Sequence, residues 1–212
     1  MNFVSHMVVA QHATPEPTTR LLLGAAAPDL VRMAQVPVAT AGPPDFMAGV
    51  VTHHRTDAVF HELDWFRVTN RRLVHDLTDR GVRRGPARGA AHVLIELLLD
   101  GAVLARAAHA TTFARPWAAL AKPDDDALAM VADEDRAPWA AFLELFTGRL
   151  EPAGYGDPHY AADRTAGTLA RRPRLAMTDD ERDVLRGLAD EVHGSISGDT
   201  EEVLARVVAA VA

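Results

Sequence analysis

Histidines and carboxylates at helical spacing are the residues of this sequence whose types could do chemistry. His92, Glu96 and Asp100 follow one another at four-residue intervals, so on a helix they form one stripe, and His53 and Asp57 share that spacing. The segment around His92 is otherwise apolar, and an unpaired polar group in a core costs ~1–3 kcal/mol or more. Facing helices of a bundle can join such imidazoles and carboxylates into a metal site. A satisfied polar network in the core would account for them equally well.

Of the remaining histidines, some lie near other polar residues on an expected helix and some are isolated. His6 lies one turn into the first expected helix, and Asp45 and Gly49 extend the stripe of His53 toward the start of its helix. The phase of that helix decides whether His53 or its neighbour His54 faces inward. The isolated histidines are expected at the surface or in helix caps: His12, His109, His159 and His193.

The composition restricts the chemistry further. The 212-residue chain contains no cysteine, which excludes disulfide scaffolds, thiolate zinc sites, iron–sulfur clusters and cysteine nucleophiles. Any metal ion must therefore be held by His, Asp and Glu. No G-x-S-x-G elbow, Walker loop or G-x-G-x-x-G fingerprint is present. Ser5 and His6 are adjacent, but neighbours on a helix point ~100° apart, so we do not expect them to act as nucleophile and base.

The charge balance is acidic, with 22 basic and 29 acidic residues and a formal net charge of −7. A general nucleic-acid binder needs clustered cations, so no nucleic-acid partner is expected. The arginines nonetheless gather at Arg71–Arg72, Arg83–Arg84 and Arg171–Arg174. Guanidinium groups suit the recognition of phosphate or carboxylate, although solvated helix faces would explain the same clusters.

Neither a membrane span nor a targeting segment is predicted. The most apolar stretch, Val93–Leu99, is interrupted by Glu96 and is far shorter than the ~20 residues that a membrane span needs. The start, MNFVSHMVVAQH, has no basic region and carries histidines within its apolar part, unlike a signal peptide. We therefore expect a cytoplasmic protein with no membrane partner.

The elements that must position these residues are helices. Apolar residues recur at three- and four-residue spacing, which predicts an all-α fold: one helical bundle of about eight to ten helices over residues 1–212. Pro28 should kink or restart the second helix, and the pattern from Asp45 to Leu77 should break near Asp57–Glu62. Arg88–Ala110 is the clearest helix. The other expected helices are Asn2–Ala13, Thr18–Ala34, Pro116–Lys122, Asp125–Asp133, Pro138–Arg149, Tyr160–Arg172, Thr178–His193 and Thr200–Val211.

Four blocks, in this order, resemble the acyl-carrier-protein phosphodiesterase family. They are MNFVSH at the start, LLLGAAAPDLVRM around Asp29, PPDFMAGVVTHHRTD over Pro43–Asp57, and ARRPRL over Ala170–Leu175. The resemblance covers residues 1–175 and leaves residues 176–212 as C-terminal packing helices. It implies an all-helical fold distantly related to the HD metal-dependent phosphohydrolases. It also implies hydrolysis of the phosphodiester that links 4′-phosphopantetheine to a carrier-protein serine.

Site residues follow from the same resemblance. It implies that His6, Asp29 and His53 sit at the metal centre, and the segment GAAAPDL, which is similar to the Ala-Pro-Asp motif of the zinc-dependent phospholipase C family, supports Asp29. The cofactor would be a divalent metal, Mn²⁺ first, with Fe²⁺, Mg²⁺ and Zn²⁺ as alternatives. The full candidate set consists of the metal ligands His6, Asp29, His53, His61, His92 and Glu96, the catalytic residues Arg55, Asp57 and Glu96, and the phosphate-binding residues Arg71, Arg171, Arg172 and Arg174.

The sequence departs from the family pattern at two places. Where the family has an Asp-His doublet, this chain has Glu96-Leu97, with His92 one turn earlier, and His61 replaces a second aspartate. We interpret these exchanges as a rebuilt site with an altered substrate. The dipeptide His75-Asp76 is similar to the doublet that names the HD phosphohydrolases, but its charged surroundings predict exposure.

Two hypotheses therefore stand. The first is a metal-dependent phosphodiesterase or phosphohydrolase acting on an acyl carrier protein or another phosphodiester. The second, supported by the missing Asp-His doublet, is a non-catalytic helical module that binds a carrier protein or a phosphopantetheine-like ligand. Small residues on long helices, and the pair Glu201-Glu202, would also suit a homodimer interface.

Overall fold

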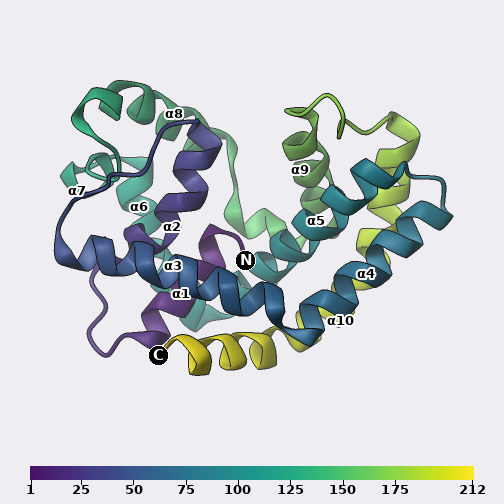
Figure 1. The fold of residues 1–212 in the computed structure, drawn as a ribbon, viewed down its shortest axis with the longest axis horizontal. Coiled ribbons are helices and arrows are strands. Elements are labelled where there is room, and N and C mark those ends of the chain that lie inside the picture. The colour runs from purple at the N-terminus through teal and green to yellow at the C-terminus, as the bar shows by residue number, and fades with distance from the viewer.

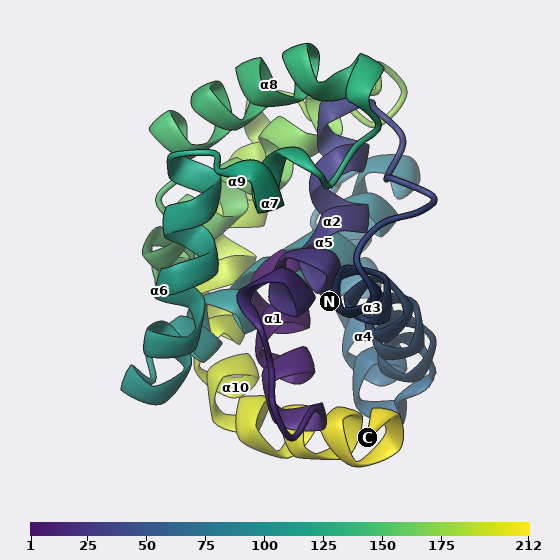
Figure 2. The same ribbon diagram turned by 90° about the vertical axis from the view of Figure 1, so that its left-hand side faces the viewer.

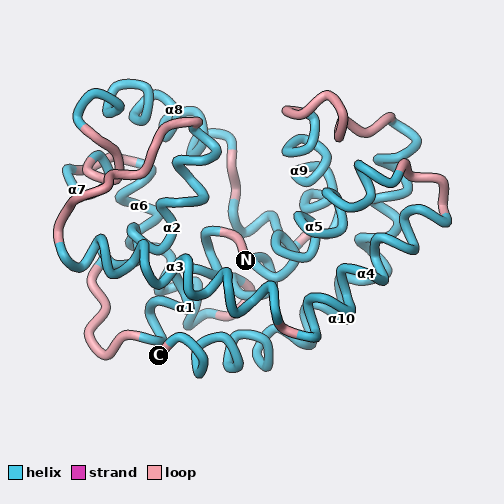
Figure 3. The backbone as a smooth tube through the Cα atoms, viewed as in Figure 1, coloured by secondary structure: helices cyan, strands magenta, loops and turns pink.

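A computed structural model describes all residues, 1–212, and contains helices and loops but no strand (Figure 3). The prediction of an all-α fold is therefore confirmed. Two short 3₁₀ segments, Asp133–Asp135 and Pro152–Gly156, accompany ten α-helices. In chain order these are α1 (Phe3–Ala13), α2 (Thr19–Ala34), α3 (Pro44–Glu62), α4 (Asp64–Asp79), α5 (Arg84–Leu104), α6 (Ala107–Ala121), α7 (Asp125–Leu128), α8 (Arg136–Arg149), α9 (Pro158–Ala170) and α10 (Asp179–Val211).

The first helix, α1, lies at the centre of the molecule (Figure 2). Every residue from Phe3 to Ala10 is buried, which is the pattern of a helix covered on all sides. Its neighbours are α2, α3, α5, α6 and α10. Ser5 and His6 are therefore held inside the protein, where each needs a polar partner or a ligand.

Helices α2 and α3 cross at a pair of glycines. A Cβ atom on Gly24 would lie 2.1 Å from the carbonyl oxygen of Phe46, and one on Gly49 would lie 2.1 Å from the carbonyl oxygen of Leu21. Any side chain at either position would push the two backbones apart. The contact brings Asp29 of α2 and His53 of α3 to the same region of the interior.

The last helix, α10, runs along one edge of the molecule, the lower edge in Figure 1. It packs on α1, α3, α4, α5 and α9, so it touches both the beginning and the middle of the chain. A single cluster of 55 buried apolar residues extends from Met1 to Val211, and the chain therefore has one core. None of the helices combines the length and apolar character that crossing a membrane would require.

Several predicted boundaries are confirmed and others are wrong. The pattern from residue 45 to 77 does break, at Leu63, whose extended backbone separates α3 from α4. Helix α2 neither stops nor restarts at Pro28. The predicted helix Arg88–Ala110 begins earlier, at Arg84, and ends at Leu104, because the chain turns at Ala105 and Arg106 before α6.

The C-terminal region also differs from the expectation. It is one helix of 33 residues instead of two, because the segment between the two expected helices stays helical. Ile196 and Thr200 are buried there, and the Thr200 hydroxyl donates to the Ile196 carbonyl 2.8 Å away. Helix α6 incorporates the predicted short helix at Pro116, and α7 ends at Leu128 instead of Asp133.

Candidate metal centre

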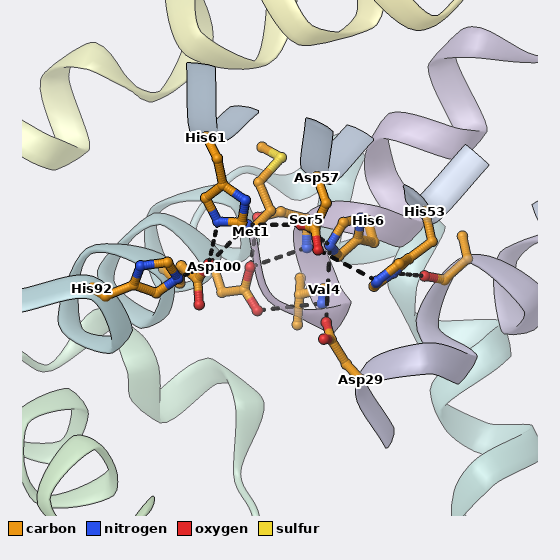
Figure 4. Close-up of polar contacts among 12 residues, drawn as sticks. Met1, Val4, Ser5, His6, Asp29, His53, Asp57, His61, His92 and Asp100 are labelled. Atoms are coloured by element: carbon orange, nitrogen blue, oxygen red, sulfur yellow. Dashed lines mark hydrogen bonds and ion pairs between the residues drawn. The ribbon is translucent and has the colours of Figure 1, made fainter. Parts of the chain in front are cut away.

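Helices α1, α2, α3 and α5 bring the six predicted metal ligands together as two triads (Figure 4). Within each triad, one ligand atom per residue lies within 4.8 Å of the others. The first triad is His6, Asp29 and His53, and the second is His61, His92 and Glu96. We refer to them below as the buried triad and the open triad.

The buried triad contains buried polar atoms that form no hydrogen bond of good geometry. Both ring nitrogens of His6 and the Oδ2 of Asp29 are buried without a hydrogen bond. His53 is held by its Nδ1, which lies 2.9 Å from the carbonyl oxygen of Ala25 and donates to it, so that its Nε2 is left as an acceptor. A backbone carbonyl that fixes a histidine in this way is the usual outer partner of a metal ligand. The donor set therefore fits a divalent cation.

Burial sets the ionisation of this triad. Burial, followed by the neighbouring His6 ring, lowers the pKa of His53 to about 3. Burial also lowers the pKa of His6, against the attraction of Asp57. The two rings stack with their centroids 3.9 Å apart, an arrangement that two neutral imidazoles tolerate better than two cations. Burial, and then the charge of Glu96, raises the pKa of Asp29 well above its usual range.

Asp57 connects the buried triad with the centre of the site. Its Oδ1 lies 3.1 Å from His6 Nε2, and its Oδ2 lies 3.6 Å from His53 Nε2. Burial alone would raise the pKa of Asp57, but the His6 contact and the amino group of Met1 hold it below its usual range. Asp57 is therefore the ionised carboxylate of this half of the site.

The open triad is built around one oxygen atom. Glu96 Oε1 lies 3.4 Å from His61 Nε2 and 3.2 Å from His92 Nε2. The two imidazoles are 33% and 41% exposed, whereas the His6 imidazole is fully buried, so the imidazoles of this triad are the ones that solvent reaches. His92, one turn before Glu96, thus supplies an imidazole beside it, as the sequence predicted.

The α-amino group of Met1 lies between the two triads, a position that no local pattern of the sequence predicts. It donates to Glu96 Oε1 at 3.0 Å and to Asp57 Oδ1 at 3.4 Å. Burial by itself would lower the pKa of this amino group, but the two carboxylates outweigh it and raise the pKa. The same amino group, with His61 and His92, holds the pKa of Glu96 well below its usual range against the opposing effect of burial.

Asp100, the third member of the predicted stripe on α5, belongs to neither triad and binds the start of α1 instead. It accepts the backbone N–H groups of Val4 and Ser5, at 3.2 and 3.0 Å, and the Ser5 hydroxyl. These are first-turn amides of α1, which has no side-chain cap of its own at Asn2. Burial raises the pKa of Asp100 to about 7, although its three donors act in the opposite direction.

The other residues of the α3 stripe divide between the site and the surface. His53, not His54, faces inward, since His53 is buried and His54 is exposed. Arg55 is exposed and has no hydrogen bond or ion pair with the triads. Asp45 does not reach the site either, since it accepts from the Thr18 hydroxyl 2.8 Å away.

The predicted phosphate-binding arginines lie in two places. Arg71 lines a cavity together with His92 of the open triad. Arg171, Arg172 and Arg174 lie in the exposed connection between α9 and α10, and none of them lines that cavity or pairs with a triad residue. The guanidinium of Arg171 donates to the carbonyl oxygen of Met33 at 3.2 Å.

The isolated histidines are mostly where they were expected. His12 and His159 are exposed, and His193 is half-buried. His75 is 71% exposed, as the charged surroundings of the His75-Asp76 doublet predicted. His109 differs, because it is buried and its Nε2 lies 3.3 Å from a carboxylate oxygen of Glu201 on α10.

Comparisons with protein-family models, with curated proteins and with solved structures found no match. A function for the chain therefore rests on the geometry of its own residues and on the short motifs of its sequence.

Proposed function

We propose that the chain is a divalent-metal-dependent phosphodiesterase. The observation that carries the proposal is the buried triad: two neutral imidazoles and a carboxyl group converge from three helices, and several of their polar atoms form no hydrogen bond. A buried polar atom without a hydrogen bond costs stability, and a ligand that binds one ring nitrogen of His6 together with Asp29 Oδ2 would account for two such atoms.

The chain's own residues fit the hydrolysis of a phosphate ester. A divalent cation, when bound, supplies Lewis-acid activation of water and offsets charge on a phosphoryl group. Asp57, ionised and in contact with both His6 and His53, orients these rings. Glu96 Oε1 accepts from Met1, and the side chains of Asp57 and Glu96 are 34% and 15% exposed, so a substrate can approach both carboxylates.

The metal and the substrate are proposed on different grounds. Imidazole and carboxylate donors without thiolates favour Mn²⁺, Fe²⁺ or Mg²⁺, and Mn²⁺ is our first choice. The sequence blocks similar to the acyl-carrier-protein phosphodiesterase family make a holo-carrier protein the first substrate to test, with release of 4′-phosphopantetheine. The exchange of an Asp-His doublet for Glu96-Leu97 favours an altered substrate.

One observation favours the second candidate, a non-catalytic helical module. The amino group of Met1 already places a positive charge between Asp57 and Glu96. In such a module this charge and the histidines would form a self-sufficient polar network that needs no cation.

The proposal is tested by comparing substitutions of the buried His53 and its exposed neighbour His54. Wild type, His53→Ala, Glu96→Ala and the matched control His54→Ala are titrated with Mn²⁺, Fe²⁺, Mg²⁺ and Zn²⁺ and followed by native mass spectrometry. We expect stoichiometric binding by wild type and His54→Ala, and loss of binding in His53→Ala. Glu96→Ala should lose activity on bis(p-nitrophenyl) phosphate and on holo-carrier protein.

The opposite result is equally clear. If wild type binds none of the four cations, or if His53→Ala and His54→Ala bind equally well, the hydrolase proposal is wrong. In that event Glu96→Ala should change only the stability of the protein, as the second candidate requires.

A further inference from the structure

A cavity next to the open triad is lined by three arginines. Its volume is about 350 Å³, and its lining consists of Asn70, Arg71, Val74, Arg84, Arg88 and His92. The first three residues come from α4 and the last three from α5. No carboxylate contributes to the lining, so the cavity is positively charged although the whole protein has a net charge of −7.

The arginines of this cavity are distinguished from their neighbours by the absence of a partner. Arg67, Arg72, Arg80 and Arg83, on the same helices and the link between them, each form an ion pair with Glu62, Asp76, Glu191 and Glu181, respectively. Arg71, Arg84 and Arg88 form no ion pair and no hydrogen bond with the protein. Three unpaired guanidinium groups around one hollow are suited to a multiply charged anion.

One stripe of α5 joins this cavity to the proposed metal centre. Arg84, Arg88, His92, Glu96 and Asp100 follow one another at four-residue intervals, so they form a stripe along α5 that turns by ~40° about the helix axis at each step. Each step advances ~6 Å along the axis, which puts Arg88 ~6 Å and Arg84 ~12 Å from His92. A small molecule could therefore reach the open triad and the cavity at once.

Resting on the proposed function, we propose that the cavity binds a second phosphate group of the substrate, remote from the phosphodiester that is cleaved. The substrate class is then a small phosphodiester that carries an additional phosphate. The concave shape favours a compact phosphate over the broad acidic surface of a carrier protein, and pockets of this size suit small ligands.

Inorganic phosphate is the probe for this cavity, used without metal and in the presence of EDTA. Binding is measured by ³¹P nuclear magnetic resonance and calorimetry for wild type, Arg71→Gln, Arg88→Gln and the control Arg149→Gln, an exposed arginine of α8 without an ion pair. We expect both cavity variants to weaken phosphate binding at least tenfold and the control to leave it unchanged. His53→Ala should also leave it unchanged, because His53 does not line the cavity.

These measurements test phosphate binding in the cavity independently of the proposed catalytic activity. Phosphate binding that persists in His53→Ala and is lost in Arg88→Gln supports the cavity even if the protein binds no metal. If the protein is an active phosphodiesterase, thymidylyl-thymidine bearing a 5′-phosphate should show a lower KM than the unphosphorylated dinucleotide, and Arg88→Gln should abolish the difference. Absence of phosphate binding by wild type, or equal binding by Arg88→Gln and Arg149→Gln, would overturn the proposal. So would binding of an apo-carrier protein, but not of phosphate, that depends on Arg88.

Discussion

At the scale of single residues, two adjacent polar side chains of the buried helix α1 differ in whether the protein satisfies their hydrogen bonds. Ser5 and His6 are adjacent and both are fully buried. Ser5 and the amides at the helix start are satisfied by Asp100, whereas Nδ1 of His6 has no partner and its Nε2 has only the Asp57 carboxylate 3.1 Å away. One position thus stabilises the fold, and the next keeps hydrogen-bonding capacity that the fold does not use.

Asp100 should consequently be important for stability. Asp100→Ala would leave two first-turn amides and the Ser5 hydroxyl without an acceptor in the core. We expect a loss of about 2–4 kcal/mol in the free energy of unfolding, since each lost buried partner costs about 1–3 kcal/mol. Urea denaturation measures it, with the exposed Asp79→Ala as a control that should change stability by less than ~0.5 kcal/mol. Equal stability of the two variants would contradict the capping role.

At the scale of elements, close helix contacts determine whether the ligands meet. Asp29 and His53 come from α2 and α3, which approach through Gly24 and Gly49. A glycine contact of this kind lets two backbones touch, and it therefore fixes the spacing of side chains that project from either helix.

Gly49→Ala should separate α2 from α3. The added Cβ would lie 2.1 Å from the Leu21 carbonyl oxygen and 2.9 Å from the Cα of Gly24, both of which are backbone atoms that cannot rotate away. We expect a destabilisation of about 3 kcal/mol, by overpacking, and weaker metal binding. The matched control is Gly187→Ala in α10, where nothing lies within 4 Å and the better helix propensity of alanine should stabilise by about 0.5–1 kcal/mol. Similar effects at both positions in urea denaturation would show that the contact is not tight.

The elements also show how far the sequence could predict this protein. Helical spacing revealed the all-α fold and the His92–Glu96–Asp100 stripe, because both depend on local periodicity. The break at Ala105 and Arg106, without proline or glycine, and the continuity of α10 depend on packing between distant segments. The part of the site supplied by Met1 was missed for the same reason, since its amino group meets Glu96 only in the folded chain.

Arg84 and Arg88 were within reach of sequence reasoning. They continue the α5 stripe by two four-residue steps before His92. The sequence singles out Arg84 only as part of the Arg83–Arg84 cluster, because the predicted helix begins at Arg88 and leaves Arg84 outside the repeat. Their lack of carboxylate partners, which makes the cavity distinctive, could only be seen in the structure.

At the scale of the whole molecule, α10 ties the two ends of the chain to its middle. Its start is fixed by a capping box, in which the Thr178 hydroxyl accepts from the Glu181 N–H and the Glu181 carboxylate accepts from the Thr178 N–H. The same carboxylate reaches across to the link between α4 and α5. There it accepts from the backbone N–H, the Nε and the Nη2 of Arg83 at 2.9, 2.8 and 2.7 Å.

Glu181 should therefore give stability that depends on pH. The Arg83 guanidinium, against the opposing effect of burial, lowers the pKa of Glu181 to about 2. Because the folded-state pKa is lower than the unfolded value of about 4.3, the contribution is complete above that value and is lost as the pH falls toward 2. Glu181→Gln should cost about 1.5–3 kcal/mol at pH 7, the range for charge-assisted hydrogen bonds.

The pH profile distinguishes this ion pair from a purely steric effect. In urea denaturation between pH 7 and pH 3.5, the stability difference between wild type and Glu181→Gln should hold above pH 5. Below the unfolded pKa it should then shrink by up to about 1.4 kcal/mol per pH unit. Glu202→Gln, which removes an exposed pair with Arg206 on the same helix, should differ from wild type by less than ~1 kcal/mol at every pH. A difference for Glu181→Gln that stays constant down to pH 3.5 would mean that packing alone, and not its charge, holds α10 against the α4–α5 link. In that case the packing of α4 and α5 alone, and not the ion pair with α10, would position the cavity arginines Arg84 and Arg88 that follow Arg83.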